Sequence, residues 1–178
     1  SLQDEVSKEN IEKFNKKIFR RAKKEPVAYI LRNKEFWKKK FLVNRNTLVP
    51  RPETELLVEK LVKIFKNKNS FFLDIGTGSG CIILSILEEI KSGRGIGLDI
   101  SKKAIDTAIK NSYKMKLSNK CKFLKTPLNQ IFNYKFDLIV SNPPYICRHQ
   151  IKNLSEDIKK FEPRIALDGG NDGLDVIK

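Results

Sequence analysis

The chain has 178 residues, of which 40% are hydrophobic and 32% are charged, a composition that fits about one globular domain and excludes a wholly disordered chain. No apolar run approaches the roughly 18 residues that a membrane span needs, and the polar start has no signal-peptide core. The 3 cysteines form no CxxC pair, so we expect no disulfide framework and no metal site, and a cytoplasmic location.

The charge balance is strongly basic, with 36 Lys and Arg against 21 Asp and Glu, a formal net charge of +15. Such a surplus suggests an anionic partner such as nucleic acid or a nucleoprotein particle. However, only eight of the basic residues are Arg, and a Lys-rich, Asn-rich and Ile-rich composition also arises from an AT-rich genome. Charge alone leaves both interpretations open.

The first part of the chain predicts a helix, a hairpin and a second helix. Residues 6–24 place apolar side chains at mostly helical spacing among many cations, which predicts a basic amphipathic helix. Residues 36–43 alternate loosely between apolar and polar, and residues 47–49 follow a turn-like Asn-Arg-Asn run at 44–46, so we predict a β-hairpin that turns there. Residues 52–65 then form a helix with Pro in its first turn.

The central part alternates between strands and helices. The predicted strands are residues 71–75, 95–100, 120–124 and 136–141, and the predicted helices between them are residues 81–90 and 102–115. This alternation predicts an α/β domain with a parallel sheet that is covered by helices on both faces.

A glycine-rich loop joins the first of these strands to its helix. The loop consists of Gly76, Thr77, Gly78, Ser79 and Gly80. Glycines allow positive φ and a close approach to a ligand, and the start of the helix offers free N–H groups. Asp99 ends the next strand, where a carboxylate can accept hydrogen bonds from ribose hydroxyls. A tight turn and a helix N-cap are the purely structural alternatives. Together the two features indicate a cofactor that carries a nucleoside.

The most specific motif is Asn142-Pro143-Pro144-Tyr145, which follows the fourth strand. Ligands of open α/β sheets bind at the carboxyl ends of the strands, so this motif should lie beside the glycine loop. Two prolines fix the backbone and expose carbonyl acceptors, Asn142 adds a side-chain acceptor, and Tyr145 offers a flat face to a planar group. Two acceptors can hold both protons of a planar NH2 group.

These residues resemble S-adenosylmethionine-dependent methyltransferases that modify amino nitrogens, and more closely the peptide chain release factor glutamine methyltransferases (the HemK/PrmC family). The similarity runs from about residue 18 to the end of the chain. The segments that carry it are Arg20-Arg21, Glu25-Pro26-Val27-Ala28-Tyr29-Ile30, Glu35-Phe36, Pro50-Arg51-Pro52-Glu53-Thr54-Glu55, Asn142-Pro143-Pro144-Tyr145-Ile146 and Glu162-Pro163-Arg164-Ile165-Ala166-Leu167-Asp168-Gly169-Gly170.

The resemblance implies transfer of a methyl group from S-adenosyl-L-methionine to the side-chain amide nitrogen of the glutamine in the Gly-Gly-Gln motif of class-1 release factors, leaving S-adenosyl-L-homocysteine. It assigns the cofactor to Gly76, Thr77, Gly78, Ser79, Gly80, Asp99, Pro127 and Asn142. It assigns the glutamine to Asn142, Pro143, Pro144 and Tyr145, of which Asn142, Pro143 and Tyr145 are the expected catalytic residues. The family usually has an Asp followed by an apolar residue after the third strand, where this chain reads Thr126-Pro127-Leu128.

The resemblance also implies a Rossmann-like class I methyltransferase sheet whose C-terminal strands are missing from this chain, preceded by a hairpin and the last helix of an N-terminal helical domain. We therefore expect three parts: residues 1–25, 26–52 and 53–178. We expect a monomer in the cytoplasm of a bacterium or of an organelle of bacterial origin, with no need for nucleic acid. The alternatives are an adenine or cytosine amino-methyltransferase acting on nucleic acid and a non-catalytic basic adaptor for RNA or ribosomes.

Overall fold

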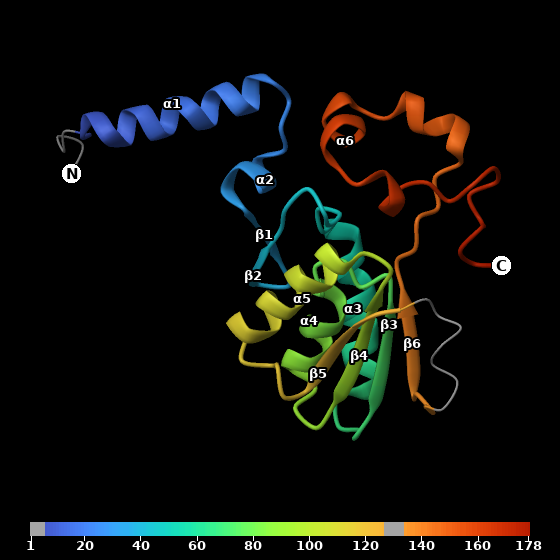
Figure 1. The fold of residues 1–178 in the computed structure, drawn as a ribbon. Helices are drawn as coiled ribbons and strands as arrows, with labels where there is room; N and C mark the ends of the chain where they lie inside the picture. Colours follow the sequence, from blue (N-terminus) through green and yellow to red (C-terminus); the bar gives the residue numbers. More distant parts are fainter. Residues whose placement is uncertain (1–5, 127–133) are drawn as a thin grey trace.

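The computed structural model describes residues 6–126 and 134–178, and a four-stranded parallel sheet forms its centre (Figure 1). The strands are β3 (Phe71–Ile75), β4 (Arg94–Asp99), β5 (Cys121–Lys125) and β6 (Leu138–Ser141), in the spatial order β5-β4-β3-β6. The predicted parallel α/β sheet is thereby confirmed. Because β3 is central and β6 returns to its other side, the strand order reverses next to β3, which is where open α/β sheets bind their ligands.

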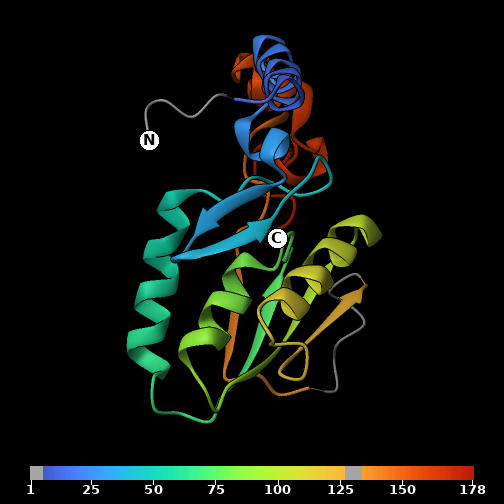
Figure 2. The same cartoon turned by 90° about the vertical axis from the view of Figure 1, so that its left-hand side faces the viewer.

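Helices α3 (Glu55–Phe65), α4 (Cys81–Glu89) and α5 (Lys102–Lys114) lie side by side over one face of the sheet (Figure 2). Apolar side chains of α3 and α4 pack with Phe72 of β3 and Val140 of β6 in the main core. The chain moves from β3 to β4 to β5 in one direction, so right-handed crossovers put α4 and α5 on the same face. Helices on both faces were predicted, but the described residues place these three on one face only.

The predicted hairpin exists, but its predicted turn is wrong. Strands β1 (Asn33–Phe36) and β2 (Lys39–Leu42) pair antiparallel around Trp37 and Lys38. Both turn residues have positive φ, +49° and +60°, the backbone of a tight two-residue hairpin turn. Such turns usually carry Asn or Gly, so this one leaves no signal in the sequence. The Trp37 Nε1–H donates to Glu89 at 2.9 Å and ties the turn to the end of α4.

The N-terminal and C-terminal parts of the chain both lie above the carboxyl edge of the sheet (Figure 1). The N-terminal part has α1 (Lys8–Ala22) and α2 (Val27–Leu31), and the C-terminal part has α6 (Glu156–Phe161) with the short 3-10 helices η3 (Arg148–Asn153) and η4 (Arg164–Ala166). Helix α1 confirms the predicted amphipathic helix and buries none of its residues. No helix within residues 6–126 or 134–178 has the length and apolarity to cross a membrane.

A small second core joins the N-terminal and C-terminal parts of the chain. Tyr29 of α2, Val43, Val49 and Phe161 of α6 are all buried together. The chain between β2 and α3 runs through this core, passing the 3-10 helix η1 (Pro52–Thr54) just before α3. We call residues 46–54 the roof segment, because they pass over the carboxyl ends of the strands.

Candidate functional site

The glycine loop has the positive-φ backbone that its composition predicts. Gly76, Gly78 and Gly80 have φ of +71°, +55° and +78°, values that residues with a Cβ rarely adopt. A Cβ on Gly80 would also lie 3.1 Å from the Leu84 side chain. The loop is held to the neighbouring strand by the Thr77 N–H, which donates to the Leu98 carbonyl at 2.8 Å. The loop therefore has a fixed shape between β3 and α4.

Asp99 lies beside this loop at the end of β4. Its carboxylate accepts a hydrogen bond from the Gly78 N–H at 3.0 Å and another from the Ser101 N–H at 2.9 Å. Ser101 is the N-cap of α5, since its hydroxyl accepts from the Ala104 N–H at 3.3 Å. Asp99 is thus oriented by two backbone donors. A carboxylate has about four acceptor positions, so about two remain for a ligand.

Asp74 lies beneath the glycine loop and was missed by the sequence reasoning. Its side chain is fully buried, and one oxygen accepts a 2.7 Å hydrogen bond from the Thr77 hydroxyl. The other oxygen has no partner among the described residues. Burial raises the pKa of Asp74 to about 7, and the nearby charge of Asp99 acts in the same direction. Asp74 therefore fixes Thr77 from below.

The Asn142-Pro143-Pro144-Tyr145 motif lies next to the glycine loop, as the sequence predicts. The register pairs Ile75 with Ser141, and the Ser141 hydroxyl donates to the Ile75 carbonyl at 2.8 Å. The motif therefore begins one residue after the point where β6 aligns with the end of β3. The Tyr145 side chain is 65% exposed, so its ring is available to a ligand.

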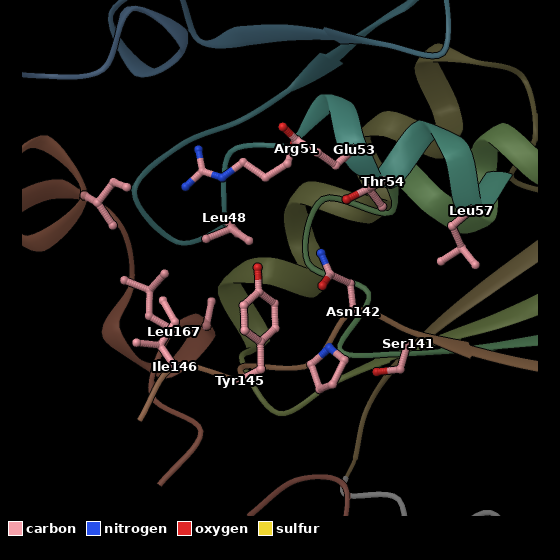
Figure 3. A pocket seen from close by; sticks show the side chains of 13 residues that line it. Leu48, Arg51, Glu53, Thr54, Leu57, Ser141, Asn142, Tyr145, Ile146 and Leu167 are labelled. Carbon is pink, nitrogen blue, oxygen red and sulfur yellow. The ribbon is translucent and has the colours of Figure 1, made fainter. Parts of the chain in front are cut away.

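Two adjoining cavities open around this motif. The larger has a volume of about 570 Å³ and is lined by residues 76–79 of the glycine loop, by Asp99, Ser101 and Thr126, and by residues 142–144. The smaller has a volume of about 440 Å³, and Tyr145, Asn142 and Thr54 face it in Figure 3. The residues that line both cavities are Leu48, Arg51, Thr54, Ser141, Asn142, Pro143 and Ala166. Asn142 and Pro143 thus lie where the two cavities meet.

The roof segment contributes Leu48, Arg51 and Thr54 to this shared wall, and none of them was predicted as a site residue. The one signal that could have found them is the Pro-Arg-Pro-Glu-Thr-Glu run, which the resemblance already singled out. The segment is fixed by the Tyr29 hydroxyl, which donates to the Thr47 carbonyl at 2.7 Å.

A buried carboxylate fixes the roof segment from its other side. The Arg51 guanidinium donates to Glu162 at 2.8 Å, and the Val49 N–H donates to the same carboxylate at 3.4 Å. Burial raises the pKa of Glu162, an effect that the Arg51 charge opposes.

One predicted cofactor contact has no described position. Pro127, assigned to the cofactor, lies outside the described residues, as does Leu128. Thr126, just before them, lines the larger cavity. Within the described parts of the chain, His, Cys, Asp and Glu form no group of three that could hold a metal ion.

The sequence is similar to methyltransferases over most of its length. Residues 66–165 match the family described as "Methyltransferase domain". The "Release factor glutamine methyltransferase" of Caulobacter vibrioides is 42% identical over 172 residues, which are 96% of this chain and 60% of that protein. The protein of the same name from Buchnera aphidicola subsp. Schizaphis graminum is 44% identical over 171 residues, which are 96% of this chain and 61% of that protein.

The chain therefore spans roughly three fifths of the length of these two relatives. Among solved structures, it is similar to the hMettl16 catalytic domain in complex with the MAT2A 3'UTR hairpin 6. The TM-score is 0.64 and the identity is 16%, over 85% of this chain and 58% of that one. At that identity the likeness concerns the fold.

Proposed function

This chain belongs to the methyltransferase domain family, and from that premise we propose that it transfers a methyl group from S-adenosyl-L-methionine to a glutamine side-chain amide of a class-1 peptide chain release factor. The glutamine is the one in the Gly-Gly-Gln motif. The relatives named release factor glutamine methyltransferase support this substrate, because they match 96% of the chain at more than 40% identity.

The larger cavity suits the cofactor in size and in its polar groups. Its volume of about 570 Å³ is within the range of roughly 300–1,000 Å³ that is usual for small-molecule sites. Asp99 would accept hydrogen bonds from the two ribose hydroxyls, and the glycine loop (residues 76–80) would let the backbone approach the ligand closely. When bound, S-adenosylmethionine supplies an electrophilic methyl group on a sulfonium.

The position of Asn142 and Pro143 at the junction of the two cavities is the observation that carries the proposal. A methyl group in one cavity can reach a nitrogen in the other only at that junction. The Asn142 side-chain oxygen and the Pro143 carbonyl would accept the two amide N–H bonds there, while the exposed ring of Tyr145 would cover the flat face of the amide.

These acceptors address the main chemical difficulty of the reaction. An amide nitrogen is a poor nucleophile because its lone pair is delocalised into the carbonyl group. Fixing the nitrogen in line with the methyl group can contribute about 7–11 kcal/mol through orientation alone. Two oxygen acceptors also stabilise the positive charge that develops on the nitrogen, so no strong base is needed before the attack.

A methyl-transfer assay with several acceptors tests the proposal. The protein is incubated with tritium-labelled S-adenosylmethionine and, side by side, a class-1 release factor, the same factor with Gln replaced by Ala in its Gly-Gly-Gln motif, DNA and RNA. Label in the unmodified release factor alone supports the proposal. Label in DNA or RNA would point to the nucleic-acid alternative, and no label in any acceptor would refute the assignment.

A further inference from the structure

Asn111 of α5 forms an unusual set of contacts away from the cavities. Its side chain is 1% exposed, and its amide nitrogen donates to the Leu42 carbonyl at 3.0 Å and to the Ser79 carbonyl at 2.9 Å. Its amide oxygen accepts from the Leu42 N–H at 2.7 Å. Both amide protons are therefore used. The amide pairs with both backbone groups of Leu42, much as a neighbouring strand would.

One of its partners lines the larger cavity, and the other leads into a segment that lines it. Ser79 is part of the glycine loop and lines that cavity. Leu42 ends β2, and the chain continues from it through Asn44 into the roof segment, of which residues 46–48, 50, 51 and 54 line the same cavity. Asn111 itself does not line the cavity. One buried amide thus joins the glycine loop to the start of the roof, and α5 acts as the rigid support between them.

We infer that Asn111 is a positioning residue for the cofactor: it holds the glycine loop and the roof segment at the spacing that S-adenosylmethionine requires. The inference rests on the proposed function only for the identity of the ligand. Without Asn111, the Leu42 N–H, the Leu42 carbonyl and the buried Ser79 carbonyl lose this partner, which weakens the link between the loop and the chain that leads into the roof.

The same helix supplies a matched control one turn earlier. The Asn44 side chain donates to the Thr107 hydroxyl at 2.9 Å, and Thr107 is also buried. This bond joins α5 to the chain between β2 and the roof segment but does not touch the glycine loop. A substitution at Thr107 therefore weakens the contact of α5 with the chain that leads into the roof segment. It leaves the Asn111 link to the glycine loop in place.

The test compares Asn111→Asp with Thr107→Val in the binding of S-adenosylhomocysteine, measured by isothermal titration calorimetry. Asn111→Asp keeps the shape of the side chain but places a carboxylate oxygen against the Leu42 and Ser79 carbonyls. We expect its dissociation constant to rise about tenfold or more, which corresponds to about 1.4 kcal/mol. Thr107→Val should lower the melting temperature and keep the dissociation constant within about threefold. Asn10→Asp, on the exposed face of α1, controls for the added charge.

Hydrogen exchange on the unmodified protein provides a second measurement that needs no variant. Saturating S-adenosylhomocysteine should slow exchange of the Leu42 amide, which is bonded to Asn111, more than that of the Phe36 and Lys39 amides at the turn end of the hairpin. This excess separates local coupling from the general stabilisation that any ligand of the folded state produces.

The outcomes distinguish failure of the inference from failure of the proposed function. If the unmodified protein does not bind S-adenosylhomocysteine, the proposed cofactor is wrong and the inference fails with it. If the unmodified protein binds and folded Asn111→Asp binds equally well, the inference alone is overturned. If that variant does not fold, equal slowing at Leu42, Phe36 and Lys39 overturns it, and a larger effect at Leu42 supports it.

Discussion

Replacing Asp74 by Asn should change how the stability of the protein depends on pH. The Asp74 carboxyl is fully buried, and burial raises its pKa from 3.8 to about 7. Between about pH 4 and pH 7 the folded protein keeps this proton while the unfolded chain has lost it. The folded state then binds more protons than the unfolded state, so the free energy of unfolding falls as the pH rises through this window.

The size of the effect follows from the shift of about three pKa units. Each unit corresponds to about 1.4 kcal/mol, so Asp74 should remove ~4 kcal/mol of stability between pH 4 and pH 7. Asn has the same shape and does not titrate. The difference between the unfolding free energies of the two proteins should therefore shift steadily in favour of Asp74→Asn over this range. Glu162, whose pKa burial also raises, is present in both proteins and cancels in the difference.

The assay is urea unfolding of both proteins at several pH values from 4.5 to 7.5, followed by the fluorescence of Trp37, the single tryptophan. The difference in unfolding free energy should change by about 1.4 kcal/mol per pH unit below pH 7. A constant difference across the range would refute the reasoning, because it would mean that the buried carboxyl does not hold its proton.

Three further predictions concern the site and its supports. Asn142→Ala should lower kcat about 100-fold or more, while the dissociation constant for S-adenosylhomocysteine rises by a much smaller factor, and near-normal turnover would contradict its assigned role. Gly80→Ala should lower the unfolding free energy by about 1–2 kcal/mol in thermal denaturation, because φ is +78° there, and an unchanged melting temperature would show that the loop relaxes. Glu25 pairs with Arg20 at 2.8 Å and Arg45 at 3.1 Å, and the Arg20 hydrogen bond lowers its pKa to about 2. Glu25→Gln should lower the free energy of unfolding by about 1–3 kcal/mol at pH 7, as measured by urea unfolding. The difference in unfolding free energy between the two proteins should shrink as the pH falls from about 4.5 towards 2, and a pH-independent difference would argue against the ion pair.

The alternating strands and the two motifs were predictable because local pattern alone specifies them. A short apolar run at residues 71–75 followed by three glycines has few alternatives to a strand, a tight loop and a helix. The motif at residues 142–145 follows a strand, and the topology of parallel sheets then places it beside the glycine loop. The assignment of individual contacts to cofactor and substrate stays a prediction, as does the domain boundary at residue 52.

The hairpin turn and the position of the roof segment over the sheet could not be predicted from local pattern, because distant contacts determine them. Trp37 accepts a positive φ in a turn that its contact with Glu89 helps to fix, and that contact joins residues 52 positions apart. Likewise, Glu162 fixes Arg51 from 111 positions away. No local pattern marks such a carboxylate as a partner. The short helix α6 that carries it into place was also absent from the prediction.

The wall shared by the two cavities limits where substrate selectivity can be redesigned. A new side chain at Leu48 or Thr54 reshapes both cavities, so any gain for a different acceptor would come with an altered cofactor affinity. Leu57, Ile146 and Ile158 line the smaller cavity only. Libraries that vary these three positions should change which acceptor is methylated while the protein keeps its cofactor affinity. Natural substitutions that change acceptor selectivity should be found at the same positions.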